Sequence, residues 1–389
     1  MPEELKSTDI LPNGAAGFDR HDATKSLIVD DSGYVFVDNA RFVSMIAIVM
    51  RHCELSLYGL TPAPAVEASI IQFRTFGVQL FFVASGFLMA NWLARRQNDV
   101  RGYCMTRLRR VAVPWLIWAG LYVVGDALRF FIGPRDPIAG LLEAVLLDIF
   151  YQAYWYVPIL LFSVAVLLSF RRYWGSRLTG VAFGLLALLY GVNLYTCWFP
   201  TSHTIALFAY LFPLWLGVWL FGNFQAVSAW SHRVQLAPLL AIAFLAFCFT
   251  LAEDRLMAQI GIPDTYNALQ ISNQIYAFTV LLILLKLPAR LAPSFVDVRK
   301  DTYGIYLTHP VVALIGRRAI NLVAGRSATG LTLFRRLPEL VHGPFARIGL
   351  WLVWTVLVYG TSLWITKKVR RSPLAWTVGV RRSPAGHKY

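Results

Sequence analysis

Apolar runs of about 18 to 20 residues recur along most of this chain, and a helix of that length crosses a hydrocarbon core of about 30 Å. Of the 389 residues, 57% are hydrophobic and only 15% are charged. A water-soluble fold would have too little polar surface to cover itself. The composition therefore excludes a soluble enzyme and an intrinsically disordered chain.

Ten apolar stretches predict an all-α polytopic membrane protein, a bundle of about ten transmembrane helices. The stretches lie at 40–60, 75–94, 111–132, 154–170, 178–197, 204–222, 235–252, 268–287, 302–322 and 348–366. Ten crossings place most connectors rich in arginine and lysine on one side of the membrane, together with both ends of the chain. Because cytoplasmic loops carry an excess of positive charge, both termini are predicted to be cytoplasmic.

This pattern divides the chain into three segments. Residues 1–37 are polar and lack the apolar core of a signal peptide, so they are expected to form a cytoplasmic tail. Residues 38–366 are the predicted transmembrane domain, and residues 367–389 are expected to form a basic cytoplasmic tail.

The formal net charge of +15 would suit a nucleic acid partner, but the basic residues form short clusters between apolar runs rather than one basic face. We interpret them as topology signals beside lipid headgroups and expect no nucleic acid partner. One connector differs, because Arg317–Arg347 carries six arginines and yet should face away from the cytoplasm. Either a span is miscounted or this connector binds an anionic partner.

Cysteine usage gives no sign of a metal site. The four cysteines lie in or beside different predicted spans, without a CxxC pair or a metal-ligand spacing. We therefore expect no disulfide, no metal and no permanently bound cofactor.

The first predicted span has the highest density of ionisable residues, each of which costs about 2.5 to 3.5 kcal/mol on insertion scales and needs a partner or a function. His52 follows Arg41 by eleven residues, about 16 Å along a helix, and the two lie on one helix face. Arg41 is expected at the cytoplasmic mouth and His52 near the middle of the bilayer. A neutral imidazole there can take a proton from a hydroxyl. The alternative is a packing histidine bonded to a neighbouring carbonyl.

Two arginines mark the start of the third span. Arg107 and Arg110 are spaced i, i+3, so we expect them to share one helix face, where two guanidinium groups suit a phosphate or pyrophosphate. Positive-inside anchoring explains the same spacing. In the second span, Ser85 and Gly86 lie among bulky aromatics and let a helix or a ligand come close.

Aromatic residues open two later spans. Tyr154-Trp155-Tyr156 begins the fourth, where interfacial aromatics are expected anyway. His309 would lie about 10 Å inside the ninth, and Pro310 frees a carbonyl one turn back. Charges near other span ends are expected to pair with one another and to carry no chemistry: Asp126 with Arg129, and Glu253 with Asp254 and Arg255.

Five of these fragments, in this order and spacing, resemble acyltransferase family 3, multi-spanning bacterial enzymes that O-acylate sugars of surface polysaccharides and related glycoconjugates. The resemblance runs from Asp38 to about Pro310. The fragments are Asp38-x-x-Arg41 with His52, Gly77-Val-x-x-Phe-Phe-Val-x-Ser85-Gly86-Phe-Leu, Arg107-x-x-Arg110-x-x-x-Pro114, Tyr154-Trp155-Tyr156 and Tyr303-Gly-Ile-Tyr-Leu-x-His309.

The resemblance implies that an acyl group, usually acetyl, passes from acyl-CoA on the cytoplasmic side of a bacterial inner membrane to a sugar hydroxyl. It implies that His52 is the essential histidine and that Arg41 orients or charges the site. Whether His52 activates the acceptor or first accepts the acyl group itself stays open. The other implied roles are phosphate binding by Arg107 and Arg110, lining of the donor channel by Ser85 and Gly86, shaping of the pocket by Trp155 and His309, and a lesser proton-handling role for His309. Trp155 and Tyr303 are also expected to contact the donor.

Two positions depart from the family pattern. Gln79 stands where many relatives have an acidic residue, and Thr302 stands where a serine is common. Both changes are expected to retune the acceptor pocket, so the acceptor is less constrained by the resemblance than the donor is.

Two other classes of function compete with this interpretation. A transporter or flippase of lipid-linked sugars would also show many spans and buried charges, but no inverted repeat is visible. A scaffold for a polysaccharide export complex would need no histidine inside a span.

Overall fold

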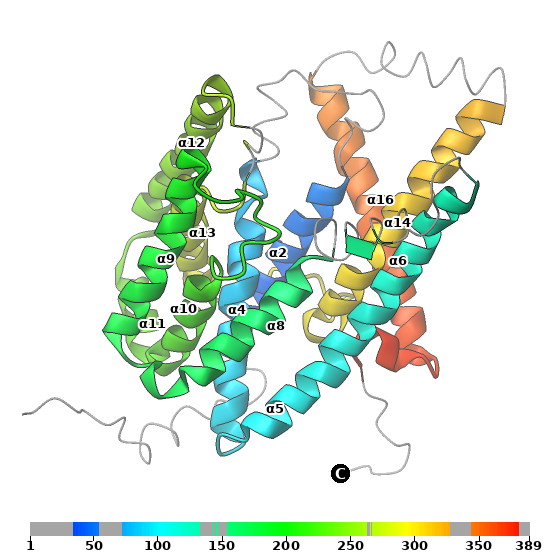
Figure 1. Ribbon diagram of the computed structural model, residues 1–389. Coiled ribbons are helices and arrows are strands. Elements are labelled where there is room, and N and C mark those ends of the chain that lie inside the picture. Colours follow the sequence, from blue (N-terminus) through cyan, green and yellow to red (C-terminus); the bar gives the residue numbers. More distant parts are fainter. Residues whose placement is uncertain are drawn as a thin grey trace, which may run out of the picture. The chain divides into compact units, whose positions relative to one another are not determined.

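The computed structural model of the chain describes residues 34–53, 72–132, 142, 145–146, 154–262, 265, 267–326 and 344–380. They lie in one unit, Tyr34–Tyr389. Helices dominate this part of the chain, and it contains no strand (Figure 1). The helices are α2 (Val35–His52), α4 (Phe76–Arg95), α5 (Val100–Arg107), α6 (Val113–Ile132), α8 (Tyr156–Ser169), α9 (Arg177–Thr196), α10 (Leu211–Gly222), α11 (Phe224–Arg233), α12 (Leu236–Gln259), α13 (Ile271–Lys286), α14 (Val298–Arg326) and α16 (Pro344–Arg371).

Each of the ten predicted stretches overlaps one of these helices, but fewer of the helices can be assigned as membrane spans. In the described part of the chain, α4, α9, α12 and α16 are long and apolar enough to cross a membrane, and α10 with α11, bent by 91°, would be a fifth crossing. The helices α8 and α13 have only 14 and 16 residues, fewer than the roughly 20 that a straight crossing needs. The protein is a helical membrane protein, and the count of ten spans with cytoplasmic termini stays a prediction.

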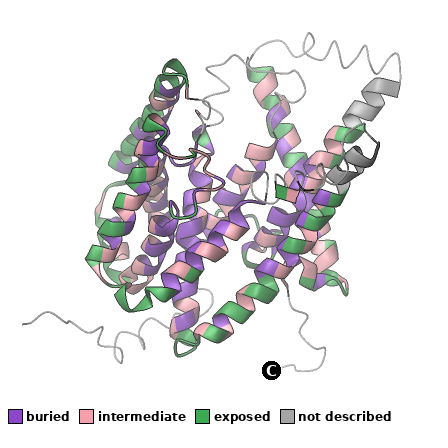
Figure 2. Cartoon of the chain, viewed as in Figure 1, coloured by how far each residue is buried: buried purple, intermediate pink, exposed green. Residues whose placement is uncertain are grey.

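The helix α4 lies at the centre of the helical unit and packs against α2, α10 and α13. Of its most apolar stretch, 67% is buried, against 28% for α9, 22% for α12 and 28% for α16. Exposed positions on those three outer helices carry large apolar side chains, such as Leu185, Phe244 and Val356. Figure 2 shows many exposed positions along α9 and α12. Apolar side chains directed outward on three separate helices suit a surface in contact with lipid.

The crossing of α4 and α10 depends on two glycines. A Cβ on Gly86 would collide with the carbonyl oxygen of Leu214, and a Cβ on Gly217 would collide with that of Val83. Two backbones can approach this closely only where both helices present a residue without a side chain. Gly86 is therefore a packing residue, because α10 lies directly against its Cα.

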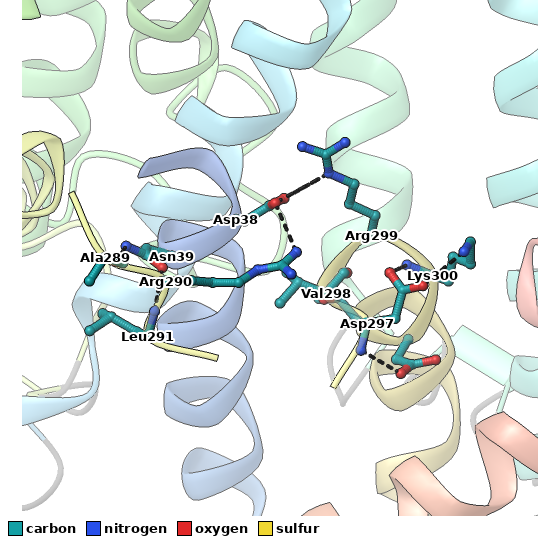
Figure 3. Close-up of polar contacts among 11 residues, drawn as sticks. Asp38, Asn39, Ala289, Arg290, Leu291, Asp297, Val298, Arg299 and Lys300 are labelled. Atoms are coloured by element: carbon teal, nitrogen blue, oxygen red, sulfur yellow. Dashed lines mark hydrogen bonds and ion pairs between the residues drawn. The ribbon is translucent and has the colours of Figure 1, made fainter. Parts of the chain in front are cut away.

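The start of α2 is joined to the linker between α13 and α14 (Figure 3). The side-chain amide of Asn39 donates to the carbonyl of Ala289 at 2.9 Å, and its oxygen accepts the backbone N–H of Leu291 at 2.8 Å. Next to it, the buried carboxylate of Asp38 pairs with Arg290 at 3.3 Å and with Arg299 at 3.2 Å. Asn39, near the start of α2, thus supplies hydrogen-bond partners for backbone groups of this irregular linker.

The acidic residues near the end of α12 do not pair with their neighbours in sequence, contrary to the prediction. Glu253 accepts the backbone N–H groups of Ile271 and Ser272, at 3.3 and 3.0 Å, and so caps the start of α13. Asp254 accepts hydrogen bonds from the side chains of Gln72 and Gln270. Each carboxylate bonds to donors on other elements rather than to its neighbour in sequence, because successive residues on a helix point about 100° apart. The side chains of the other predicted pair, Asp126 and Arg129, lie outside the described residues.

The helical part of the chain extends beyond both predicted boundaries of the transmembrane domain, 38 and 366. Residues 34–37 are buried or nearly so, and α2 already begins at Val35. At the other end, α16 continues to Arg371, and a short turn at Ala375–Val378 follows. The indole of Trp118 donates to the carbonyl of Thr377 at 2.9 Å. The described part of the C-terminal segment is therefore packed onto the helices, while residues 1–33 and 381–389 lie outside the described residues.

Candidate active site

A cavity of about 300 Å³ lies where the end of α2 meets the starts of α4 and α8 and one face of α14. On α2 the lining residues are Ala47, Ile48, Arg51 and His52, and on α14 they are Tyr306, Pro310, Ala313 and Arg317. Spacings of three, four and seven residues place side chains on one helix face, so each helix presents one continuous stripe to the cavity. The remaining lining residues are Arg74, Thr75, Val78, Tyr122, Trp155, Tyr156, His203, Thr204 and Ala268.

Two predicted histidines meet beside this cavity. The ring centroids of His52 and His309 are 5.1 Å apart, although the two residues lie on different helices and 257 positions apart in sequence. His309 is fully buried, and its Nδ1 lies 3.0 Å from the carbonyl oxygen of Ile305. A carbonyl only accepts, so Nδ1 carries a hydrogen, and in a neutral ring Nε2 then keeps its lone pair. Among the described residues, Nε2 has no hydrogen-bond partner.

Arg41 lies outside the cavity lining, on the part of α2 toward its start. It is close enough to Asp38, Arg107, Arg299 and Tyr156 to interact electrostatically with each of them. The structure thus brings Arg41 and Arg107 into one region. His52 lies three helical turns away along α2, about 16 Å by helical rise.

Arg107 and Arg110 do not share a face, contrary to the prediction from their spacing. The helix α5 passes into a π-helical segment at Leu108–Ala112 before α6 begins, and its wider turn rotates i and i+3 side chains away from each other. Arg107 donates from Nε to the hydroxyl of Tyr103 at 2.8 Å and lies 5.0 Å from the centroid of that ring. Arg110 is exposed and lines a separate hollow of about 400 Å³ with Trp376.

Tyr303 belongs to the same region. Its hydroxyl donates to the carbonyl of Val111 at 2.6 Å, inside the π-helical segment, and its ring stacks on Tyr306 with centroids 6.1 Å apart. Tyr303 therefore joins α14 to the segment that follows Arg107, and through Tyr306 it touches the wall of the cavity.

Tyr156 lies between the arginines and the histidines. Its ring lines the cavity, its hydroxyl is 3.4 Å from the hydroxyl of Ser85, and it interacts electrostatically with Arg41 and Arg107. Neither arginine belongs to the cavity lining. Tyr156 thus connects the two groups, because it contacts the cavity with its ring and interacts with both arginines.

Trp155 is in the cavity wall, and it has a partner that the sequence did not indicate. Its ring meets the ring of His203 edge to face, with centroids 5.1 Å apart. His203 belongs to the connector between α9 and α10, where no helical period places a side chain. Arg74 was also missed, although an arginine directly before an apolar helix is a signal that could have been used.

The two departures from the family pattern have local partners. Gln79 is buried and donates to the carbonyl of Ala268 at 3.2 Å, and Thr302 donates to the carbonyl of Val298 at 2.5 Å. Neither residue lines the cavity. Among the described residues, no group of three or more His, Cys, Asp or Glu side chains is arranged to hold a metal ion.

A protein-family model described as an acyltransferase domain matches residues 34–367. The match covers every residue of the cavity wall. Comparison with curated proteins and with solved structures gives no match.

Proposed function

Because the chain belongs to acyltransferase family 3, we propose that this membrane acyltransferase moves an acyl group, in the first instance acetyl, from acyl-CoA to a sugar hydroxyl. The acceptor belongs to a surface polysaccharide or another glycoconjugate. The protein is a multi-pass protein of a bacterial inner membrane, and it receives its donor from the cytoplasm. The transporter and scaffold alternatives predict binding of sugars without acyl transfer.

The observation that carries this proposal is the pair of histidines at a cavity of substrate size. His52 accepts the proton of the acceptor hydroxyl as its oxygen attacks the thioester carbonyl, a new ester C–O bond forms and the C–S bond breaks. The proton then passes to the sulfur of coenzyme A, which leaves as the thiol. His309 is held by the carbonyl of Ile305 with Nε2 as an acceptor, so it can relay this proton or orient the ring of His52.

The donor side of the proposal rests on the residues around Tyr156. Arg41 and Arg107 supply positive charge for the phosphates of acyl-CoA. Tyr156 interacts with both arginines, contacts the hydroxyl of Ser85 and lines the cavity, so the pantetheine arm would pass along Tyr156 and Ser85. Arg110 lies on the exposed surface beside it and contacts the nucleotide end, whereas Gly86 acts by keeping α4 and α10 in contact.

The test is acyl transfer by the purified full chain in detergent micelles, with radiolabelled acetyl-CoA and a panel of glycosides. His52→Ala should lower the rate of transfer by about a hundredfold or more, the scale of losing acid–base catalysis. His232→Ala is the matched control, because His232 is exposed at the end of α11. Equal rates for His52→Ala and wild type, with unchanged thermal unfolding, would contradict the proposed base.

A further inference from the structure

A second group of arginines surrounds the cavity, apart from the donor arginines. Arg51 from α2, Arg74 from the turn before α4 and Arg317 from α14 all line it. The described lining residues include no aspartate or glutamate. All three guanidinium groups are close enough to His52 to interact with it electrostatically. Three cationic side chains from three different elements therefore surround the proposed base.

Two of these arginines are built into the protein rather than extended into solvent. Arg74 is 3% exposed, donates from Nη1 to the carbonyl of Met50 at 2.5 Å and lies 5.9 Å from the ring centroid of Trp351. Arg317 has a buried Nε without a hydrogen-bond partner among the described residues. A buried guanidinium donor is stabilised by an anion that accepts from it.

The size and walls of the cavity restrict what that anion belongs to. About 300 Å³ is at the lower end of the roughly 300 to 1,000 Å³ of ligand pockets, which suits one sugar unit and not a whole coenzyme A. The aromatic side chains of Tyr122, Trp155, Tyr156 and Tyr306 are part of its wall. Such rings offer large, flat, amphipathic surfaces to the C–H face of a sugar.

The position of this cluster also separates it from the donor. Arg51 is ten residues after Arg41 on α2, about 15 Å farther along the helix. Arg317 opens the connector that carries six arginines and that the ten-span prediction places on the side away from the cytoplasm. Arginines on the side away from the cytoplasm are not explained by the positive-inside rule, so their presence needs another explanation.

We propose that the acceptor carries an anionic group, a carboxylate or a phosphate, close to the hydroxyl that is acylated, and that Arg51, Arg74 and Arg317 bind this group. The inference deepens the proposed function, because it names the class of acceptor. The bound anion holds the sugar against the aromatic wall with one hydroxyl directed to His52. A neutral glycan lacks this contact and is a poor acceptor.

The experiment measures binding of small glycosides to the purified full chain in detergent micelles without acyl-CoA, so that it does not depend on turnover. The probes are methyl glucuronoside, glucose 1-phosphate and the neutral methyl glucoside. We expect at least one anionic probe to bind wild type about tenfold or more tightly than the neutral one, the scale of a charge-assisted hydrogen bond. Tighter binding of the glucuronoside identifies a carboxylate, and tighter binding of the phosphate identifies a phosphorylated sugar.

Variants test whether the arginines cause this preference. Arg317→Gln should remove most of it, and Arg317→Lys should restore part of it by returning the charge. Arg318→Gln is the matched control, because Arg318 is the next residue, is exposed and lies outside the cavity lining. If the Gln variant does not fold, the comparison of the three probes on wild type still decides.

Two results would overturn the inference: equal binding of charged and neutral probes by wild type, or loss of coenzyme A binding in Arg317→Gln with glycoside binding unchanged. The second result would assign the cluster to the donor. Failure of the proposed function looks different, since wild type would then transfer no acetyl group to any acceptor, whatever its glycoside binding. Acyl transfer with equal KM for neutral and anionic glycosides would support the acyltransferase function and contradict only the proposal of an anionic acceptor.

Discussion

The two ends of α2 place polar residues inside a helical membrane protein in opposite ways. At the start, Asp38 and Asn39 are buried and have partners on the linker between α13 and α14 (Figure 3). At the end, Arg51 and His52 line the cavity. Polar groups bonded to protein partners stabilise the fold, whereas polar groups in the wall of a cavity are placed to contact a ligand as well. The following changes break or sharpen this comparison, from the largest effect to the smallest.

The largest effect is expected from His309, beside the cavity end of α2. His309→Asn can keep a donor to the carbonyl of Ile305 but has no Nε2, so kcat should fall on the order of tenfold to a hundredfold if that atom handles the proton. The thermal unfolding midpoint and KM should change little. Steady-state kinetics with acetyl-CoA, together with unfolding in detergent, checks both. A kcat equal to that of wild type would make His309 a packing residue.

At the other end of α2, Asn39→Ala removes both hydrogen bonds to the linker. Each is worth about 0.5 to 1.5 kcal/mol, so the free energy of unfolding should fall by about 2 kcal/mol, with kcat nearly unchanged. Chemical unfolding in detergent measures this difference. Asn91→Ala is the control, because the side chain of Asn91 makes an exposed bond to Arg95. Equal stability of the two variants would show that the linker does not depend on Asn39.

A smaller effect is expected for Arg299→Gln. Its ion pair with Asp38 is partly exposed, and Arg290 remains as a partner, so the loss of stability should be about 0 to 1 kcal/mol. Removing both arginines should cost more than the sum of the single changes, because the buried carboxylate of Asp38 then loses both ion-pair partners and, among the described residues, keeps only Arg41 nearby. Additive losses in this double-variant cycle would mean that the carboxylate is hydrated.

The smallest effect concerns Asp297, which lies outside the membrane spans. Burial opposes ionisation of its carboxyl, but Lys300, 2.9 Å away, outweighs this and holds the pKa of Asp297 below its usual value. A carboxyl with a lowered pKa stabilises the folded state above its unfolded pKa of about 4, and this contribution disappears as the pH falls through the lower folded pKa. Lys300→Ala should therefore lower the unfolding midpoint slightly at pH 7 and less at pH 3. The same difference at both values would exclude the ion pair as the cause.

Particular residues show how far the candidate site could be predicted. The pattern of Arg41 and His52 on one face of the first helix is a local property of a helix, and α2 contains both residues as predicted. The spacing of Arg107 and Arg110 predicted a shared face on the assumption of a regular α-helix. A π-helical segment at Leu108–Ala112 changes the rotation between the two residues, and an i, i+3 pattern does not reveal it. The roles of these residues in catalysis stay predictions.

Residues that join the site from elsewhere could not be predicted. His203 and Arg74 reach the cavity from a connector and a turn, which have no periodicity to reveal a facing direction. Gly86 was noted as a small residue, but only its contact with Leu214 distinguishes packing from channel lining.

The amino-acid sequence by itself determined the helical membrane class, the place of each apolar helix and the family motifs, because these depend on hydrophobic length and on spacing within one helix. Only the tertiary structure decided that His52 meets His309, that Arg51, Arg74 and Arg317 surround one cavity, and that Arg110 is separated from Arg107. These relations join segments far apart in sequence, and packing between helices, such as the glycine contact of α4 with α10, brings such segments together.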